Sequence, residues 1–247
     1  MSNLKNRLEE TSSVVQSMTA VDSLRWLSEQ FPGEVSYSTA FGLEGQVITH
    51  FIFKNKIPIK VFTLDTGRHF QETYSVWRAT NEKYGVNIEA YYPQAFSVEK
   101  LLNEKGPNSF YDSVENRKEC CYIRKVEPLN RALKGQKIWI SGVRSEHSEQ
   151  RSEMKQVEWD AQREMIKVYP LFYWTLDEVK ALIRNENIPY NELFDKGFTS
   201  IGCAPCTRSV KNGDDERAGR WWWENNTEKE CGIHVPEDFI QPTNWTI

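Results

Sequence analysis

The chain has 247 residues, of which 39% are hydrophobic and 27% charged, which is ordinary for a protein that buries a sizeable core. Its formal net charge of −4 argues against a general nucleic-acid binder, and no apolar run approaches the roughly 20 residues that cross a bilayer. The polar N-terminus lacks a secretory signal, so we expect a cytoplasmic protein without nucleic-acid or membrane partners.

Helical and β-prone segments alternate along the first two thirds of the chain. Apolar residues at helical spacing between positions 4 and 31 predict an N-terminal helical segment over residues 1–33. Five strands are then predicted, over residues 35–39, 59–65, 87–92, 137–143 and 166–169. Helices are predicted over residues 46–53, 70–84 and 177–187, the last opened by a capping box of Thr175 and Glu178. This alternation predicts an α/β fold, a Rossmann-like parallel sheet flanked by helices.

Three loops follow predicted strands at the edge where such sheets bind ligands. The first includes Gly42 and is preceded by Ser36 and Ser38 of the strand itself, the second covers residues 65–68 and the third residues 142–145. The first loop offers small residues and a helix N-terminus to an anion, although it matches neither a Walker A nor a dinucleotide-binding glycine motif. Taken alone, it could equally be an ordinary strand-to-helix turn.

Four of the five cysteines form two close pairs, Cys120-Cys121 and Cys203-x-x-Cys206. Without an export signal, such cysteines indicate metal binding or catalysis more than disulfides. The C-x-x-C could be a redox dithiol, half of a zinc site or half of an iron–sulfur site. Adjacent cysteines depart from zinc spacing and favour an iron–sulfur cluster. The plain alternative is two buried, unreactive cysteines plus a coincidental C-x-x-C.

The fifth cysteine, Cys231, lies near the C-terminus in a polar stretch and is followed by glycine. We expect it to be accessible on a mobile tail, which suits a nucleophile, although an exposed spectator thiol is the alternative. Glu228 and Glu230 raise its expected pKa, so activation would require nearby cations.

Four segments together resemble one enzyme family. They are Lys-Glu-Cys-Cys-Tyr-Ile-Arg-Lys at 118–125, Ser-Ile-Gly-Cys-Ala-Pro-Cys-Thr-Arg at 200–208, Glu-Arg-Ala-Gly-Arg-Trp-Trp-Trp-Glu at 216–224 and Lys-Glu-Cys-Gly-Ile-His at 229–234. The chain resembles the assimilatory adenylyl-sulfate (APS) reductases, the iron–sulfur branch of the APS/PAPS reductase family. The resemblance implies an adenine nucleotide α-hydrolase-like fold, with a nucleotide-binding domain over residues 34–220 and a C-terminal tail over residues 221–247.

The resemblance also implies a reaction in sulfate assimilation and cysteine biosynthesis. Cys231 would attack the sulfur of adenosine 5′-phosphosulfate, giving a cysteine S-sulfonate and AMP, and then sulfite. Cys120, Cys121, Cys203 and Cys206 would hold a 4Fe–4S cluster. Because no thiol then remains to resolve the intermediate, thioredoxin or glutaredoxin would be the electron donor.

Substrate contacts are expected from the loops and from local cations that stabilise the transferring group. The candidate substrate-binding residues are Ser36, Ser38, Gly42, Leu64, Lys125, Arg144, Arg151, Arg217 and Arg220. By resemblance, Leu64 would contact adenine, and Arg217 and Arg220 the nucleotide phosphate, while Lys125 could screen the cluster from the substrate. A PAPS or dual APS/PAPS reductase, and a zinc-containing nucleotide-binding module without redox chemistry, remain open. The N-terminal helical segment could serve a homo-oligomer.

Overall fold

The computed structural model describes residues 4–147, 154–211 and 215–224. Among them is a six-stranded sheet in the order β3-β2-β1-β4-β6-β5. The strands are β1 (Val35–Thr39), β2 (Lys60–Leu64), β3 (Glu89–Tyr91), β4 (Ile138–Ile140), β5 (Val157–Asp160) and β6 (Met165–Val168). All five predicted strands are present, and β1 lies in the middle of the sheet with β2 and β4 as its parallel neighbours.

One edge of the sheet differs from the prediction of a purely parallel arrangement. β5 pairs antiparallel with β6, with Trp159 opposite Ile166, and the sequence analysis did not predict this strand. It is short, and it joins β6 through a tight connection in which Glu164 has a positive φ of 51°. A four-residue edge strand needs its neighbour to satisfy its backbone groups, so its own sequence carries little signal.

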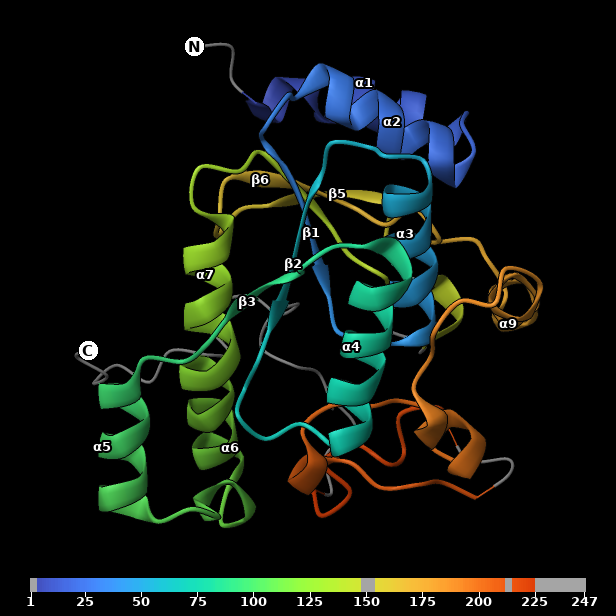
Figure 1. The fold of residues 1–247 in the computed structure, drawn as a ribbon. Helices are drawn as coiled ribbons and strands as arrows, with labels where there is room; N and C mark the ends of the chain where they lie inside the picture. Colours follow the sequence, from blue (N-terminus) through green and yellow to red (C-terminus); the bar gives the residue numbers. More distant parts are fainter. Residues whose placement is uncertain (1–3, 148–153, 212–214, 225–247) are drawn as a thin grey trace.

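Helices cover both faces of the sheet. Figure 1 shows α3 (Leu43–Lys54), α4 (Gln71–Tyr84) and α9 (Leu176–Asn185) on one side, with α5 (Ala95–Lys105), α6 (Val114–Cys121) and α7 (Glu127–Leu133) on the other. Two buried clusters correspond to these faces. Ile138 and Ile140 belong to the cluster that contains the apolar side of α3, whereas Phe62 and Trp139 pack with Leu129 of α7. Alternate residues of the central strands therefore bury on opposite faces.

The N-terminal segment is divided into η1 (Leu4–Arg7), α1 (Leu8–Gln16) and α2 (Ala20–Gln30). The division falls at Thr19, whose hydroxyl accepts a hydrogen bond from the backbone N–H of Asp22 and caps α2. Leu24 and Leu27 are fully buried in the same core as β1, and Figure 1 shows α1 and α2 across the end of the sheet near β5 and β6. No described helix is long and apolar enough to cross a membrane.

α6 and α7 lie end to end, joined by a π-helical turn, η3 (Tyr122–Val126). Pro128 at the start of α7 lacks an N–H, and in a regular α-helix its ring would clash with the carbonyl of residue 124. A π turn at this point relieves that clash and also changes the direction of the side chains that it carries. Those side chains include Arg124 and Lys125, which closely follow the cysteine pair.

After β6, regular structure becomes sparse. The predicted capping box is present at Thr175 and Glu178, and α9 follows. Two short helical turns follow, η5 (Glu192–Lys196) and η6 (Ala204–Cys206), whereas η2 (Ser109–Tyr111) and η4 (Ser145–His147) lie before β6 in the chain. The last described segment, residues 215–224, pairs with the η6 loop through an isolated antiparallel bridge between Thr207 and Arg220. Hydrogen bonds of individual loop residues therefore position the last quarter of the described chain.

Candidate active site

A cavity of about 500 Å³ lies at the carboxyl ends of β1, β2 and β4, where the strand–loop pattern predicts a ligand. Later parts of the chain also line it: residues 197–202, Val210, Lys211, Glu216, Arg217 and Arg220. Of the candidate substrate-binding residues, those that line it are Ser38, Gly42, Leu64, Lys125, Arg144, Arg217 and Arg220.

The loop from β1 to α3 contributes polar backbone to this cavity. Gly42 is the N-cap of α3, so the free N–H groups of the first helical turn lie at the cavity wall. Phe41 has a positive φ of 56°, an uncommon conformation outside glycine that clusters at functional loops. The hydroxyl of Ser38 accepts a hydrogen bond from the Trp139 indole at 2.8 Å. Ser36, by contrast, is fully buried within β1 and does not line the cavity.

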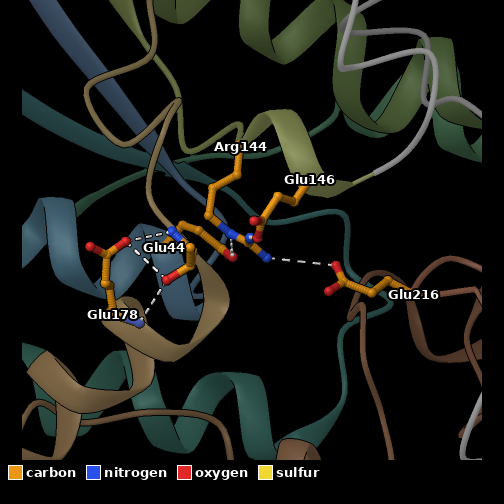
Figure 2. Close-up of polar contacts among 6 residues, drawn as sticks. Glu44, Arg144, Glu146, Glu178 and Glu216 are labelled. Atoms are coloured by element: carbon orange, nitrogen blue, oxygen red, sulfur yellow. Dashed lines mark hydrogen bonds and ion pairs between the residues drawn. The ribbon is translucent and has the colours of Figure 1, made fainter.

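Arg144 lines the cavity, but carboxylates surround its guanidinium. Its Nε lies 2.7 Å from Glu44, Nη1 lies 3.0 Å from Glu146 and Nη2 lies 3.7 Å from Glu216. Figure 2 shows the three acids converging on Arg144 from three different segments. The arrangement joins the β4 loop to α3 and to the 215–224 segment, and it places three carboxylates around one guanidinium charge. The predicted contact between Arg144 and the substrate therefore remains a prediction.

Sequence reasoning missed several cavity residues. Glu44 follows Gly42 by two positions, and Lys180 and Lys211 add cations to the wall. His69 also lines it, with Nε2 donating to the Leu64 carbonyl at 3.0 Å. Burial is the main cause that lowers the pKa of His69, so its ring is neutral near pH 7. Glu44 and His69 had one signal in the sequence, their position beside the predicted strand-end loops, whereas the two lysines had none.

The two cysteine pairs, which are far apart in the sequence, meet in a second, smaller cavity. Cys120, Cys121, Cys203 and Cys206 all line a space of about 20 Å³ between the end of α6 and the η6 loop. The β2–α4 loop holds the C-x-x-C turn in place, because Ala204 N–H donates to the Arg68 carbonyl at 2.8 Å. The structure thus brings together the four predicted ligands.

The cysteine cavity contains buried donors that an anionic group would satisfy. Among the described residues, Nε of Arg124, Nε of Arg220 and Nε1 of Trp221 are buried without a hydrogen-bond partner, and all three residues line this cavity. Burial raises the pKa of Cys206 to about 12 and also raises the pKa of Cys120. Buried thiols with such pKa values ionise when a metal binds them.

This donor set fits an iron–sulfur cluster, which combines cysteine ligands with sulfur atoms that accept hydrogen bonds. Within the described ranges, however, no three His, Cys, Asp or Glu side chains are grouped closely enough to hold a metal ion. The cluster and its four ligands therefore remain a prediction.

Two cations belong to both cavities. Lys125 and Arg220 line the large cavity as well as the cysteine cavity. Arg220 stacks 4.7 Å from the centroid of the Trp221 ring, and its guanidinium lies against Gly202, where any Cβ would collide with it. Gly202 directly precedes the first cysteine of the C-x-x-C, so the absence of a side chain there lets Arg220 reach between the cavities.

Two predicted site residues lie outside the described ranges. Arg151 falls in residues 148–153 and Cys231 in residues 225–247. Their assignments as a substrate contact and as the catalytic nucleophile stay predictions from the sequence.

Comparison with known proteins finds a matching family and relatives of similar sequence. Residues 34–209 match the phosphoadenosine phosphosulfate reductase domain. A protein from Allochromatium vinosum named adenosine 5′-phosphosulfate reductase is 46% identical over 203 residues, which cover 82% of this chain and 79% of the relative. A protein of the same name from Agrobacterium fabrum is 41% identical over 94% of this chain and 90% of its own length.

Solved structures show the same fold. The phosphoadenylyl-sulfate (PAPS) reductase from Candida auris, in a phosphate complex, superposes with a TM-score of 0.70 at 31% identity over 83% of this chain and 97% of that one. The Candida glabrata FMN adenylyltransferase gives 0.52 at 18% identity over 95% and 86%, a likeness of fold alone. These matches confirm the predicted Rossmann-like, adenine nucleotide α-hydrolase-like architecture.

Proposed function

This chain belongs to the phosphoadenosine phosphosulfate reductase family, and on that premise we propose that it reduces adenosine 5′-phosphosulfate to sulfite and AMP. The observation that carries the proposal is the large cavity, with a helix N-terminus on one side and the cations Lys125, Arg217 and Arg220 on another. An adenine nucleotide with a charged sulfate–phosphate anhydride needs both features. Relatives named for this activity, with which the chain shares 41% and 46% of aligned residues, support it.

In the first step, the thiolate of Cys231 attacks the sulfur atom of the substrate. A sulfur–sulfur bond forms as the bond from sulfur to the bridging phosphate oxygen breaks, and AMP leaves with the electron pair. Negative charge grows on that oxygen, so Lys125 and Arg220 at the wall stabilise the transition state if the sulfate lies beside them. The same cations would activate Cys231, since Glu228 and Glu230 flank it in the sequence and oppose its ionisation.

In the second step, an external thiolate attacks the sulfur of Cys231 and releases sulfite. This leaves a mixed disulfide that a second thiol of the donor resolves, so two thiols supply the two electrons that take sulfate to sulfite. A dithiol protein such as thioredoxin or glutaredoxin is the proposed donor. Because four of the five cysteines are assigned to the second cavity, this chain has no thiol left for the task.

We further propose that Cys120, Cys121, Cys203 and Cys206 hold a 4Fe–4S cluster. When bound, the cluster would join α6 to the η6 loop and place an anionic group beside the cations that face the substrate. Arg124, Arg220 and Trp221 would donate to it through the N–H groups that otherwise lack partners. In this proposal the cluster does not carry the electrons of the reduction.

An anaerobic assay tests the reaction. The purified protein is given adenosine 5′-phosphosulfate or its 3′-phosphorylated form, with thioredoxin as reductant, and sulfite is measured. We expect sulfite from the first substrate. Sulfite from the 3′-phosphorylated substrate alone would contradict the proposal and indicate a PAPS reductase, and sulfite from both would indicate dual use.

The covalent step has its own measurement. Without thiol, mass spectrometry is expected to find one sulfonate per chain on Cys231, and Cys231→Ser is expected to abolish sulfite formation while AMP still binds. Full turnover by Cys231→Ser would disprove the nucleophile. Metal analysis of the same sample tests the cofactor, because zinc in place of iron would favour a nucleotide-binding module without this chemistry.

A further inference from the structure

A buried tryptophan holds the hydroxyl of Ser38 at the edge of the large cavity. Nε1–H of Trp139, in β4, donates to Ser38 Oγ at 2.8 Å, and the two residues are 101 positions apart in the sequence. Ser38 lies near the end of β1 and lines the cavity, whereas Trp139 is fully buried behind the lining residues. The Ser38 hydroxyl has no other hydrogen-bond partner among the described residues, so its own proton is available to a ligand.

The direction of the side chains along β1 shows which side of the cavity this hydroxyl serves. Tyr37 points toward α3, where its hydroxyl donates to the Gly45 carbonyl at 2.8 Å. Because side chains alternate along a strand, Ser38 points to the opposite face, where Trp139 packs with α7. Leu64 packs against that same cluster and also lines the cavity. The Ser38 hydroxyl therefore lies on the side of the cavity that Leu64 helps to form.

The ring of Trp139 is itself held in place by two cations. Nζ of Lys167 lies 4.9 Å from the ring centroid, and Cζ of Arg163 lies 5.5 Å from it. Both cations are bonded to the buried carboxylate of Asp160, Lys167 at 3.0 Å and Arg163 at 2.8 Å. These cation–π contacts and the apolar packing fix the indole ring, so its N–H keeps one direction toward Ser38.

A serine hydroxyl that accepts such a bond must direct its own proton elsewhere. The oxygen carries one proton and two lone pairs, and the proton can occupy three staggered positions about the Cβ–Oγ bond. The indole N–H can only donate, so it occupies a lone pair and excludes the proton from that direction. The donated bond also polarises the hydroxyl and makes it a stronger donor. Ser38 is therefore prepared to donate into the cavity.

We infer that Trp139 is a positioning residue for nucleotide binding: it orients the Ser38 hydroxyl to donate to an acceptor atom of the bound adenine nucleotide. The inference rests on the proposed function, which takes the large cavity as the nucleotide site. Packing alone does not require the indole nitrogen, because an apolar ring fills such a space without a buried N–H that needs a partner. The N–H thus supplies orientation in addition to packing.

A double-mutant cycle tests whether the effect of Trp139 passes through Ser38. The dissociation constant of AMP and the midpoint of urea unfolding are measured for wild type, Ser38→Ala, Trp139→Phe and the double variant. Trp159→Phe is the matched control, because it makes the same change in β5 of the same sheet, at a residue that does not line the cavity.

We expect Ser38→Ala to weaken AMP binding about fivefold, the usual effect of losing one hydrogen bond. Trp139→Phe should weaken it about threefold, because the released hydroxyl distributes its proton over three orientations. In the Ser38→Ala background, Trp139→Phe should change the affinity by less than about 1.5-fold, and Trp159→Phe should retain wild-type affinity. Unchanged affinity in Ser38→Ala or in folded Trp139→Phe would overturn the inference. So would an equal loss from Trp139→Phe in both backgrounds, because Ser38 would then not transmit the effect.

A second measurement needs no variant of Trp139, in case Trp139→Phe does not fold. In nitrogen–proton correlation spectra, the indole resonance of Trp139 is identified as the one that moves upfield most in Ser38→Ala, where its N–H loses the acceptor. Adding AMP to the wild type should move this resonance downfield, because donation by Ser38 to the nucleotide makes its oxygen a stronger acceptor. A resonance that stays in place at saturating AMP would disprove the orientation of Ser38 by Trp139.

The wild-type protein distinguishes this inference from the proposed function. If AMP does not bind to the wild type, the proposed nucleotide site fails and the inference fails with it. If AMP binds to the wild type and the Ser38 and Trp139 variants match its affinity, the positioning inference alone fails.

Discussion

The two cavities of this protein share one wall but are built in different ways. The large one lies at the carboxyl edge of the sheet, and the hydrogen-bonded strands and the capped start of α3 determine its shape. The cysteine cavity is formed by one helix end and one irregular loop. Its lining includes four thiols and, among the described residues, three buried N–H groups without a hydrogen-bond partner, those of Arg124 Nε, Arg220 Nε and Trp221 Nε1. The comparison shows that strand ends and the start of α3 supply one side of a nucleotide-sized space, whereas the cysteine cavity has buried N–H groups that a bound anionic group would satisfy.

Lys125 and Arg220 make the two cavities interdependent. Each can interact with an anion on either side, so a change in one cavity should alter anion binding in the other through these side chains. Variants that affect one cavity, both cavities or neither can test how far the two cavities act independently.

The largest effect is expected from Cys203→Ser, which removes a proposed ligand from the cysteine cavity. Loss of one of four thiolates should abolish bound iron and visible absorption and greatly destabilise the fold, since metal binding is coupled to folding. Cys231→Ser is the control and should retain full iron content. Full iron content in Cys203→Ser would show that the cysteine cavity is not the metal site.

The next effect is expected in the large cavity, from Arg144→Met. This change leaves the carboxylates of Glu44, Glu146 and Glu216 without their shared cation, and breaking a buried ion pair typically costs about 3–5 kcal/mol of folding free energy. Glu146→Gln removes only the exposed partner and should cost less than about 1 kcal/mol. Urea unfolding measures both, and equal costs would contradict the central role of Arg144.

A smaller effect is expected where the cavities meet, from Gly202→Ala. The added methyl group collides with the Arg220 guanidinium, so Arg220 must move away from the shared wall. Loss of one charge-assisted contact should weaken AMP binding about tenfold. In the Arg220→Lys background the collision is relieved, so Gly202→Ala should have little effect on AMP binding. If Gly202→Ala weakened AMP binding equally in that background, the collision with Arg220 would not be the cause.

The smallest effect concerns a site outside both cavities. His50 is held in the core, where Nδ1 lies 2.8 Å from the Tyr84 hydroxyl, and burial lowers its pKa, with Lys54 acting in the same direction. The unfolded chain therefore binds a proton more readily, so this contribution to stability is complete above about pH 6.5 and is lost as pH falls below it.

The urea midpoint should accordingly fall slightly from about pH 7 to about pH 5.5, and His50→Gln should flatten this slope. Tyr84→Phe, which keeps the titrating ring, is the control and should retain it. An unchanged slope in His50→Gln would assign the pH dependence to other groups.

Local patterns in the sequence predicted much of the fold. The five strands and the capping box of α9 follow from alternation and from caps, which depend on residues only a few positions apart. The close spacing within each cysteine pair identified thiols that the fold brings into one cavity. The strand-end loop with Ser38 and Gly42 likewise predicted one wall of the larger cavity.

Other features depend on pairings that only the folded chain creates. β5 forms because β6 satisfies its backbone, and the π turn accommodates Pro128 within a longer helical path. Arg144 was expected to face an anion, yet folding surrounds it with acids from three segments.

The sequence by itself therefore determined the family, five of the six strands and the close spacing of the cysteines, because these depend on residue types and short spacings. Tertiary structure alone decided that Lys125 and Arg220 serve two cavities, and that Arg117 meets Glu224 across 107 positions. The physical reason is that the strength of an ion pair or a hydrogen bond depends on which groups, distant in the sequence, are buried beside it. Residues that are neighbours along the chain do not allow that environment to be predicted.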